Sequence, residues 1–177
     1  MCWSILSLLF VLLISQCVES GISTTYTAPS TATFNDDEAA TISYYYISTY
    51  SNPTFSGLKK LSSYAVITLQ VWAPHTYSSD MRFLLYHPDG SKITISNRRG
   101  PYKNVFDGTL FTDSAADSVA TYPFTKNGVV TPLRPEDPLS TFRGKSPNGQ
   151  WKFSVDDNFS SDDGMLNRVL LIIQGNI

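Results

Sequence analysis

The stretch Trp151-Lys-Phe-Ser-Val-Asp-Asp-Asn-Phe-Ser-Ser-Asp-Asp-Gly-Met-Leu166 decides how this chain folds. Its first half alternates apolar Trp151, Phe153 and Val155 with polar residues, which is the period of a half-buried β-strand. Four aspartates then fall within the eight residues 156–163, and the chain leaves this loop at Gly164. The stretch therefore predicts a core strand, a loop rich in carboxylates, and a second strand that follows the glycine.

The pattern of short strands continues toward the N-terminus. Ala65, Ile67, Leu69 and Val71 fall on one face of a predicted strand at 65–72, which makes this its core face. Further strands are predicted at 41–47, 81–86, 92–95, 105–111 and 169–173, and the prolines between 123 and 138 predict an irregular excursion. Short strands separated by turns such as His87-Pro-Asp-Gly90 are typical of a β-sandwich. We therefore expect one all-β domain, a β-sandwich or jelly roll.

Composition supports a packed domain and excludes one class of partner. The 177 residues are 13% aromatic and only 16% charged, which is unlike a disordered chain. The formal net charge is −2 and the basic residues are scattered, so we do not expect binding to nucleic acid.

The N-terminal segment predicts secretion. Residues 5–14 are almost wholly apolar, and Val18 and Ser20 suit the −3 and −1 positions of signal peptidase, so 1–20 is predicted as a signal peptide. An uncleaved anchor is the alternative, although the apolar run is short for a membrane span. Residues 21–32 predict a flexible leader, and 33–175 the domain itself. Both cysteines fall in the signal peptide, so the secreted, extracellular product would have no disulfide and no membrane segment.

The sequence does not predict an enzyme. Only two histidines, His75 and His87, are available as a base, and each stands beside a proline or at a turn. No Gly-x-Ser-x-Gly motif or other nucleophile motif accompanies them, and two isolated histidines do not make a zinc site. The tyrosine-rich strand at 41–47 allows a sugar-binding surface, although tyrosines also serve simply as packing.

The acidic loop predicts a calcium site. Calcium prefers six to eight oxygen ligands, and Asp156, Asp157, Asp162 and Asp163 supply carboxylates within one short loop. The spacing does not follow the EF-hand, and a solvated acidic turn is the alternative. Asn158-Phe-Ser160 is also an N-glycosylation sequon, and a glycan there would compete with Asn158 as a ligand.

Several motifs in order resemble the P/Homo B domain of subtilisin/kexin-like proprotein convertases. They include His75-Thr-Tyr-Ser-Ser-Asp80, the Phe106–Ala116 region, Leu133-Arg-Pro-Glu136, Leu139-Ser-Thr-Phe-Arg-Gly144 and Pro147-Asn-Gly-Gln-Trp151. The closing part, with Val155-Asp-Asp157 and Asp163-Gly-Met-Leu-Asn167, matches only loosely, because the glycine directly follows Asp163 here. The resemblance covers about residues 33–175. It implies a single jelly-roll β-barrel or sandwich of the galactose-binding-like kind, which does no chemistry itself.

What the resemblance implies is a regulatory module. In that family the domain follows a subtilisin-like catalytic domain, stabilises it and tunes its calcium and pH dependence. We therefore expect a non-catalytic binding module whose partner is a subtilisin-like protease or another extracellular protein. A fragment of a serine endopeptidase and an extracellular carbohydrate-binding module are the alternatives. The last strand, 169–173, is apolar on both faces, which predicts a strand buried on both sides, one covered by the leader, or a face that docks a partner.

Overall fold

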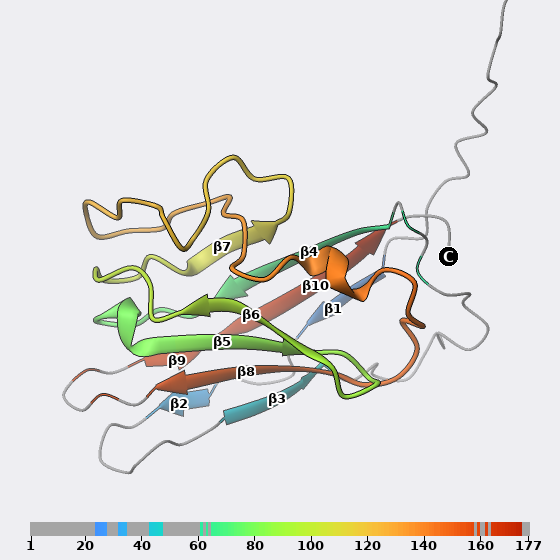
Figure 1. Cartoon of the computed structure of the whole chain (residues 1–177). Helices are drawn as coiled ribbons and strands as arrows, with labels where there is room; N and C mark the ends of the chain where they lie inside the picture. Colours follow the sequence, from blue (N-terminus) through green and yellow to red (C-terminus); the bar gives the residue numbers. More distant parts are fainter. Residues whose placement is uncertain are drawn as a thin grey trace, which may run out of the picture.

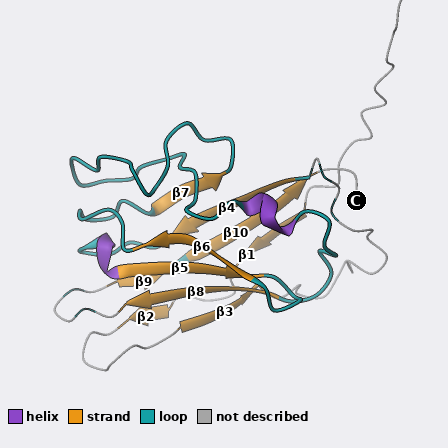
Figure 2. Ribbon diagram, viewed as in Figure 1, coloured by secondary structure: helices purple, strands orange, loops and turns teal. Residues whose placement is uncertain are grey.

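The computed structural model is built of β-strands with two short 3-10 helices in the part of the chain that it describes (Figure 2). The described residues are 24–27, 32–34, 43–47, 61, 63, 65–157, 159, 162 and 164–174. The predicted signal peptide, Asn158 and Asp163 lie outside these residues. Within the described ranges no helix has the length and apolar character needed to cross a membrane.

The strands form two four-stranded antiparallel sheets and one two-stranded sheet in the described part of the chain (Figure 1). The elements are β1 (Thr24–Thr27), β2 (Ala32–Phe34), β3 (Ser43–Ile47), β4 (Val66–Trp72), η1 (Ser78–Asp80), β5 (Met81–Tyr86), β6 (Lys92–Asn97), β7 (Asp107–Thr112), η2 (Leu139–Phe142), β8 (Trp151–Asp157), β9 (Gly164–Leu166) and β10 (Arg168–Gln174). One large sheet has the order β1-β10-β4-β7, the other β3-β8-β5-β6, and β2 pairs with β9.

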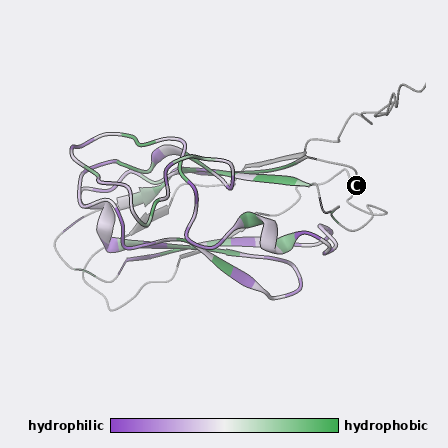
Figure 3. Ribbon diagram, turned by 45° about the horizontal axis from the view of Figure 1, so that its top comes forward, coloured by the Kyte–Doolittle hydropathy of each residue, from purple (hydrophilic) through white to green (hydrophobic). Residues whose placement is uncertain are grey.

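The strand order is that of a jelly roll, so the predicted fold class is confirmed. The chain passes repeatedly from one large sheet to the other, and each sheet combines strands from both ends of the sequence. Such a crossing pattern of eight strands in two sheets defines a double Greek key. The two sheets lie as two layers when the molecule is seen edge on (Figure 3).

Every second side chain of the core strands points into the space between the two sheets and fills it. The predicted core face of β4 is confirmed, because Ala65, Leu69 and Val71 are fully buried and Ile67 is nearly so. On β8, Trp151, Phe153 and Val155 are buried as predicted, but Ser154 and Asp156 are buried as well. The second face of β8 is therefore more buried than the half-buried pattern predicted, because Ser154 and Asp156 lie beside Leu84 and Arg82 of β5 in register.

The segment predicted as a flexible leader contributes a strand. Thr24–Thr27 forms β1, which pairs antiparallel with β10, and Ala32 begins β2, so the prediction of a flexible 21–32 needs correction for these five residues. The physical reason is that β10 offers backbone hydrogen-bonding groups on both sides, and β1 and β4 take one side each. On the second face of β10, Leu170 is 9% exposed, so most of its apolar side chain is already covered.

The proline-rich excursion closes one side of the sandwich. At the edge of β7, the Leu133 amide donates to the Leu110 carbonyl at 2.9 Å. At the edge of β6, the Glu136 amide donates to the Ile95 carbonyl at 3.1 Å. Because β7 and β6 belong to different sheets, residues 131–137 join the two layers and leave neither of these edges open.

Candidate functional site

The two aspartates that end β8 have different partners. Consecutive strand residues face opposite sides of a sheet, so Asp156 and Asp157 diverge. Asp156 is 4% exposed and forms an ion pair with Arg82, its register partner on β5. Asp157 instead accepts a hydrogen bond from His75, with 2.7 Å between Oδ2 and Nε2. The predicted calcium ligands are therefore not all directed at one point.

His75 is a buried residue that organises this end of the sandwich. Its Nδ1 accepts the Tyr77 backbone N–H at 3.0 Å, so Nε2 carries the ring proton and donates to Asp157. In a Ser-His-Asp triad one ring nitrogen binds the aspartate and the other binds the serine. Both nitrogens of His75 are already occupied, which leaves none for a serine.

The acidic loop folds back onto the segment that contains His75. Thr76 Oγ1 donates to Asp162 Oδ1 at 2.8 Å, and Gly164 forms a β-bridge with His75. A Cβ atom on Gly164 would lie only 2.1 Å from His75 Cδ2, so the close approach requires glycine at this position. The structure thus joins Asp157 and Asp162 to residues 75–80, which are about eighty positions earlier in the sequence.

Asp80 is the acidic residue that the sequence did not single out as a site. It lies in η1, is 7% exposed, and its carboxylate has no hydrogen bond or ion pair among the described residues. Burial, followed by the charges of Asp157 and Asp162, raises the pKa of Asp80, while His75 and Arg98 oppose this shift. Only its place at the end of the motif that begins at His75 could have drawn attention to it.

Asp80, Asp157 and Asp162, together with His75 and Thr76, are here called the acidic end. Figure 1 shows η1, the loop after β6 and the end of β8 together at this end of the sandwich. No three His, Cys, Asp or Glu side chains among the described residues are placed so that they could hold a metal ion. The predicted calcium site, which also included Asp163, stays a prediction, as does glycosylation of Asn158.

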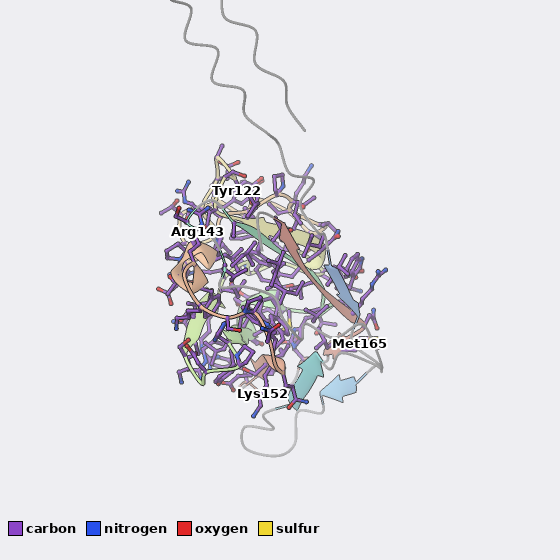
Figure 4. The ribbon with its side chains drawn as sticks, turned by 90° about the vertical axis from the view of Figure 1, so that its right-hand side faces the viewer. Tyr122, Arg143, Lys152 and Met165 are labelled. Carbon is purple, nitrogen blue, oxygen red and sulfur yellow. The ribbon has the colours of Figure 1, made fainter. Side chains whose placement is uncertain are left out.

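Exposed aromatic and apolar side chains surround the acidic end. Six large hydrophobic side chains are exposed in the described part of the chain, and four of them flank this end: Tyr77 at 43%, Tyr102 at 37%, Phe159 at 52% and Met165 at 36%. Met165 lies at the margin of the molecule beside β2 (Figure 4). Since isolated exposed apolar residues are normal, their concentration at one end is the informative feature.

The second histidine belongs to the core rather than to a site. The His87 ring stacks on Phe142, with 5.3 Å between the ring centroids, and contacts the edge of Trp151 at 4.7 Å. Its Nδ1 accepts the Asp89 backbone N–H within the predicted turn, where the Gly90 amide also donates to the His87 carbonyl. His87 therefore ties a hairpin turn to the aromatic core.

Comparison with known families identifies the domain. The model of the proprotein convertase P-domain matches residues 64–173, which is more than half of the chain. The chain belongs to this family. The match confirms the resemblance, and it places the chain among non-catalytic domains that accompany subtilisin-like proteases. The match lies inside the predicted domain, 33–175, whose outer boundaries stay a prediction.

Two solved structures are similar to this P-domain, while no curated protein matches its sequence. One is the serine protease of Aeromonas sobria in complex with its chaperone, with 13% identity, a TM-score of 0.41, and coverage of 87% of this chain. The other is the same protease alone, with 15% identity, a TM-score of 0.39, and coverage of 86% of this chain. This chain spans 27% of the length of each solved protease. These TM-scores are too low to support a conclusion about function.

Proposed function

We propose that this P-domain is a secreted, non-catalytic module that binds a subtilisin-like serine protease and stabilises it. The observation that carries the proposal is the family match over residues 64–173. His75 is the best candidate for a catalytic base, but both of its ring nitrogens already form hydrogen bonds. Neither nitrogen is left to activate a nucleophile, which supports a role outside catalysis.

The test is whether the domain changes the kinetic stability of a protease. The catalytic domain of a subtilisin-like protease from the same organism would be heated alone and with the purified P-domain, and its residual peptidase activity followed over time. We expect slower inactivation and co-elution of the two proteins in gel filtration. A Trp151→Ala variant, whose core is disrupted, serves as the control and should give no protection. An unchanged inactivation rate at saturating P-domain would contradict the proposal.

Secretion follows from the predicted signal peptide, 1–20, and belongs to the same proposal. Expression of the full chain in a eukaryotic secretory host should release a product that begins at Gly21. N-terminal sequencing measures the cleavage site, and a glycosidase-sensitive mass shift would report modification of Asn158. Retention of the product in the membrane fraction would favour the uncleaved anchor instead.

We also propose calcium as a structural ligand of the acidic loop, with Asp156, Asp157, Asp162 and Asp163 as the candidate ligands. Asp156 contributes less to this proposal, since Arg82 already neutralises it. The effect of calcium on thermal stability tests the site independently of any protease.

A further inference from the structure

Asp80 is 7% exposed, and its carboxylate makes no hydrogen bond or ion pair with the described residues. A carboxylate that is buried without a charged or hydrogen-bonding partner destabilises the folded state unless something binds it. Arg98 is nearby, but its Nη1 donates to the Asp80 backbone carbonyl at 3.1 Å rather than to the carboxylate. The side chain of Asp80 is thus 7% exposed, negatively charged and available at the surface of the acidic end. Such a group marks a place where a ligand can supply the missing interaction.

The charges around Asp80 are predominantly negative. Asp80, Asp157 and Asp162 contribute three carboxylates, and Arg98 contributes one guanidinium. His75 lies between these groups, and its Nε2 is 2.7 Å from Asp157 Oδ2. The surface at this end is therefore complementary to a cation.

The aromatic side chains around the acidic end favour a guanidinium over a small ion. Tyr77 lies two residues from His75 and three from Asp80, and the Tyr102 carbonyl accepts the Ser78 amide at 3.3 Å, which ties both tyrosines to η1. Phe159 already has the guanidinium of Arg98 4.8 Å from its ring centroid. Aromatic faces beside carboxylates bind arginine well, since the planar guanidinium stacks on a ring while its N–H groups pair with oxygen.

We propose that the acidic end binds an extended, arginine-bearing segment of a partner protein, with one guanidinium on Asp80 and the flanking apolar residues on Tyr77, Tyr102 and Phe159. The pairing would neutralise a buried charge, and the exposed rings would lose contact with water. This inference rests on one part of the proposed function, namely that the domain is a binding module. The partner that carries the arginine can be a protein other than the protease.

The test uses a short fluorescent peptide with two arginines between leucines, titrated into the full-length mature chain and followed by fluorescence anisotropy. The matched peptide replaces each arginine with citrulline, which keeps the shape and removes the charge. We expect saturable binding that weakens at least about tenfold with citrulline, because one charged pair in a partly desolvated site contributes about 1.4 kcal/mol or more. Binding should also weaken as salt rises.

Two variants locate the binding site, and a third controls for net charge. Asp80→Asn and Phe159→Ala should each weaken binding of the arginine peptide, whereas Asp117→Asn should not. Asp117 is an exposed aspartate outside the acidic end, so its substitution changes the net charge equally. Asp80→Asn is also expected to fold more stably than the natural chain, so reduced binding by this variant cannot be attributed to unfolding.

Three outcomes would overturn the inference. These are the absence of saturable peptide binding, equal loss in Asp80→Asn and Asp117→Asn, and a citrulline peptide that binds as well as the arginine peptide. A calcium-induced rise in melting temperature that depends on Asp80, without peptide binding, would identify a metal ion as the occupant instead. If the peptide fails while the domain still protects a protease, the surface assignment is wrong and the proposed function stands.

Discussion

Gly164→Ala is the sharpest test of how the acidic loop is held. The added Cβ would lie 2.1 Å from Cδ2 of the buried His75 ring and 3.1 Å from its Nε2. The φ of Gly164 lies outside the left-handed region, so alanine suits its backbone and only the collision matters. The imidazole must move, and its 2.7 Å hydrogen bond to Asp157 would be lost.

The expected loss in the free energy of unfolding combines two effects. Overpacking a rigid interior costs about 1–3 kcal/mol, and losing a hydrogen bond to a charged acceptor costs about 1.5–3 kcal/mol. Together they predict a loss of about 3–5 kcal/mol, which lowers the melting temperature by about 10 °C in a domain of this size. Urea unfolding, followed by tryptophan fluorescence, gives the free energy directly.

A double-mutant cycle identifies the cause. In a His75→Ala background the ring is absent, so the methyl group of Gly164→Ala occupies vacated space and should cost less than about 1 kcal/mol. A coupling energy of about 2 kcal/mol or more between the two positions is therefore expected. Equal destabilisation by Gly164→Ala in both backgrounds would refute the reasoning, because the strain would then lie in the backbone rather than against the ring.

Three further predictions concern the acid, the core and the metal. Asp80→Asn should raise the free energy of unfolding at neutral pH, because the pKa of Asp80 is raised on folding and its charged form is disfavoured. This gain should be absent at low pH, where Asp80 is protonated in both states, and should grow as pH rises through its folded pKa; urea unfolding across a pH series measures it. Trp151→Ala should cost about 3–5 kcal/mol, whereas Trp151→Phe, which keeps an aromatic ring but loses the 3.0 Å bond to the Pro147 carbonyl, should cost less. Calcium should raise the melting temperature and EDTA lower it, with the effect lost in Asp157→Asn/Asp162→Asn; a melting temperature unaffected by either addition would count against calcium.

Much of the fold could be predicted because strand patterns are local. The period of two in 65–72 identified β4 and its buried face, and the bounds of β5 were predicted without error. Turn residues located the hairpin between β5 and β6. The sequence did not reveal that Ser154 and Asp156 would be buried, because their burial depends on neighbours supplied by distant strands.

The candidate site was only partly visible in the sequence. Asp157 and Asp162 were identified from their clustering, and the structure joins both to residues near His75. Asp156 is adjacent to Asp157 in the sequence, but successive side chains of a strand point to opposite faces, so the two carboxylates lie apart. Asp156 instead forms an ion pair with Arg82. Asp80 was missed because its burial depends on three-dimensional packing. The spacing of residues in the sequence does not show this packing.

The sequence by itself determined the class of this protein: an all-β domain of the P-domain family, with its core strands and its turns. Those features depend on side-chain period and turn chemistry, which act over a few residues. Only the tertiary structure decided which edges are closed and which charges meet. Residues 131–137 join the two sheets, and Gly164 brings the acidic loop against His75. Both features depend on contacts between segments that are far apart in the chain. The free energy of such contacts depends on how the surfaces fit and how much of them is buried, which the local residue pattern does not show.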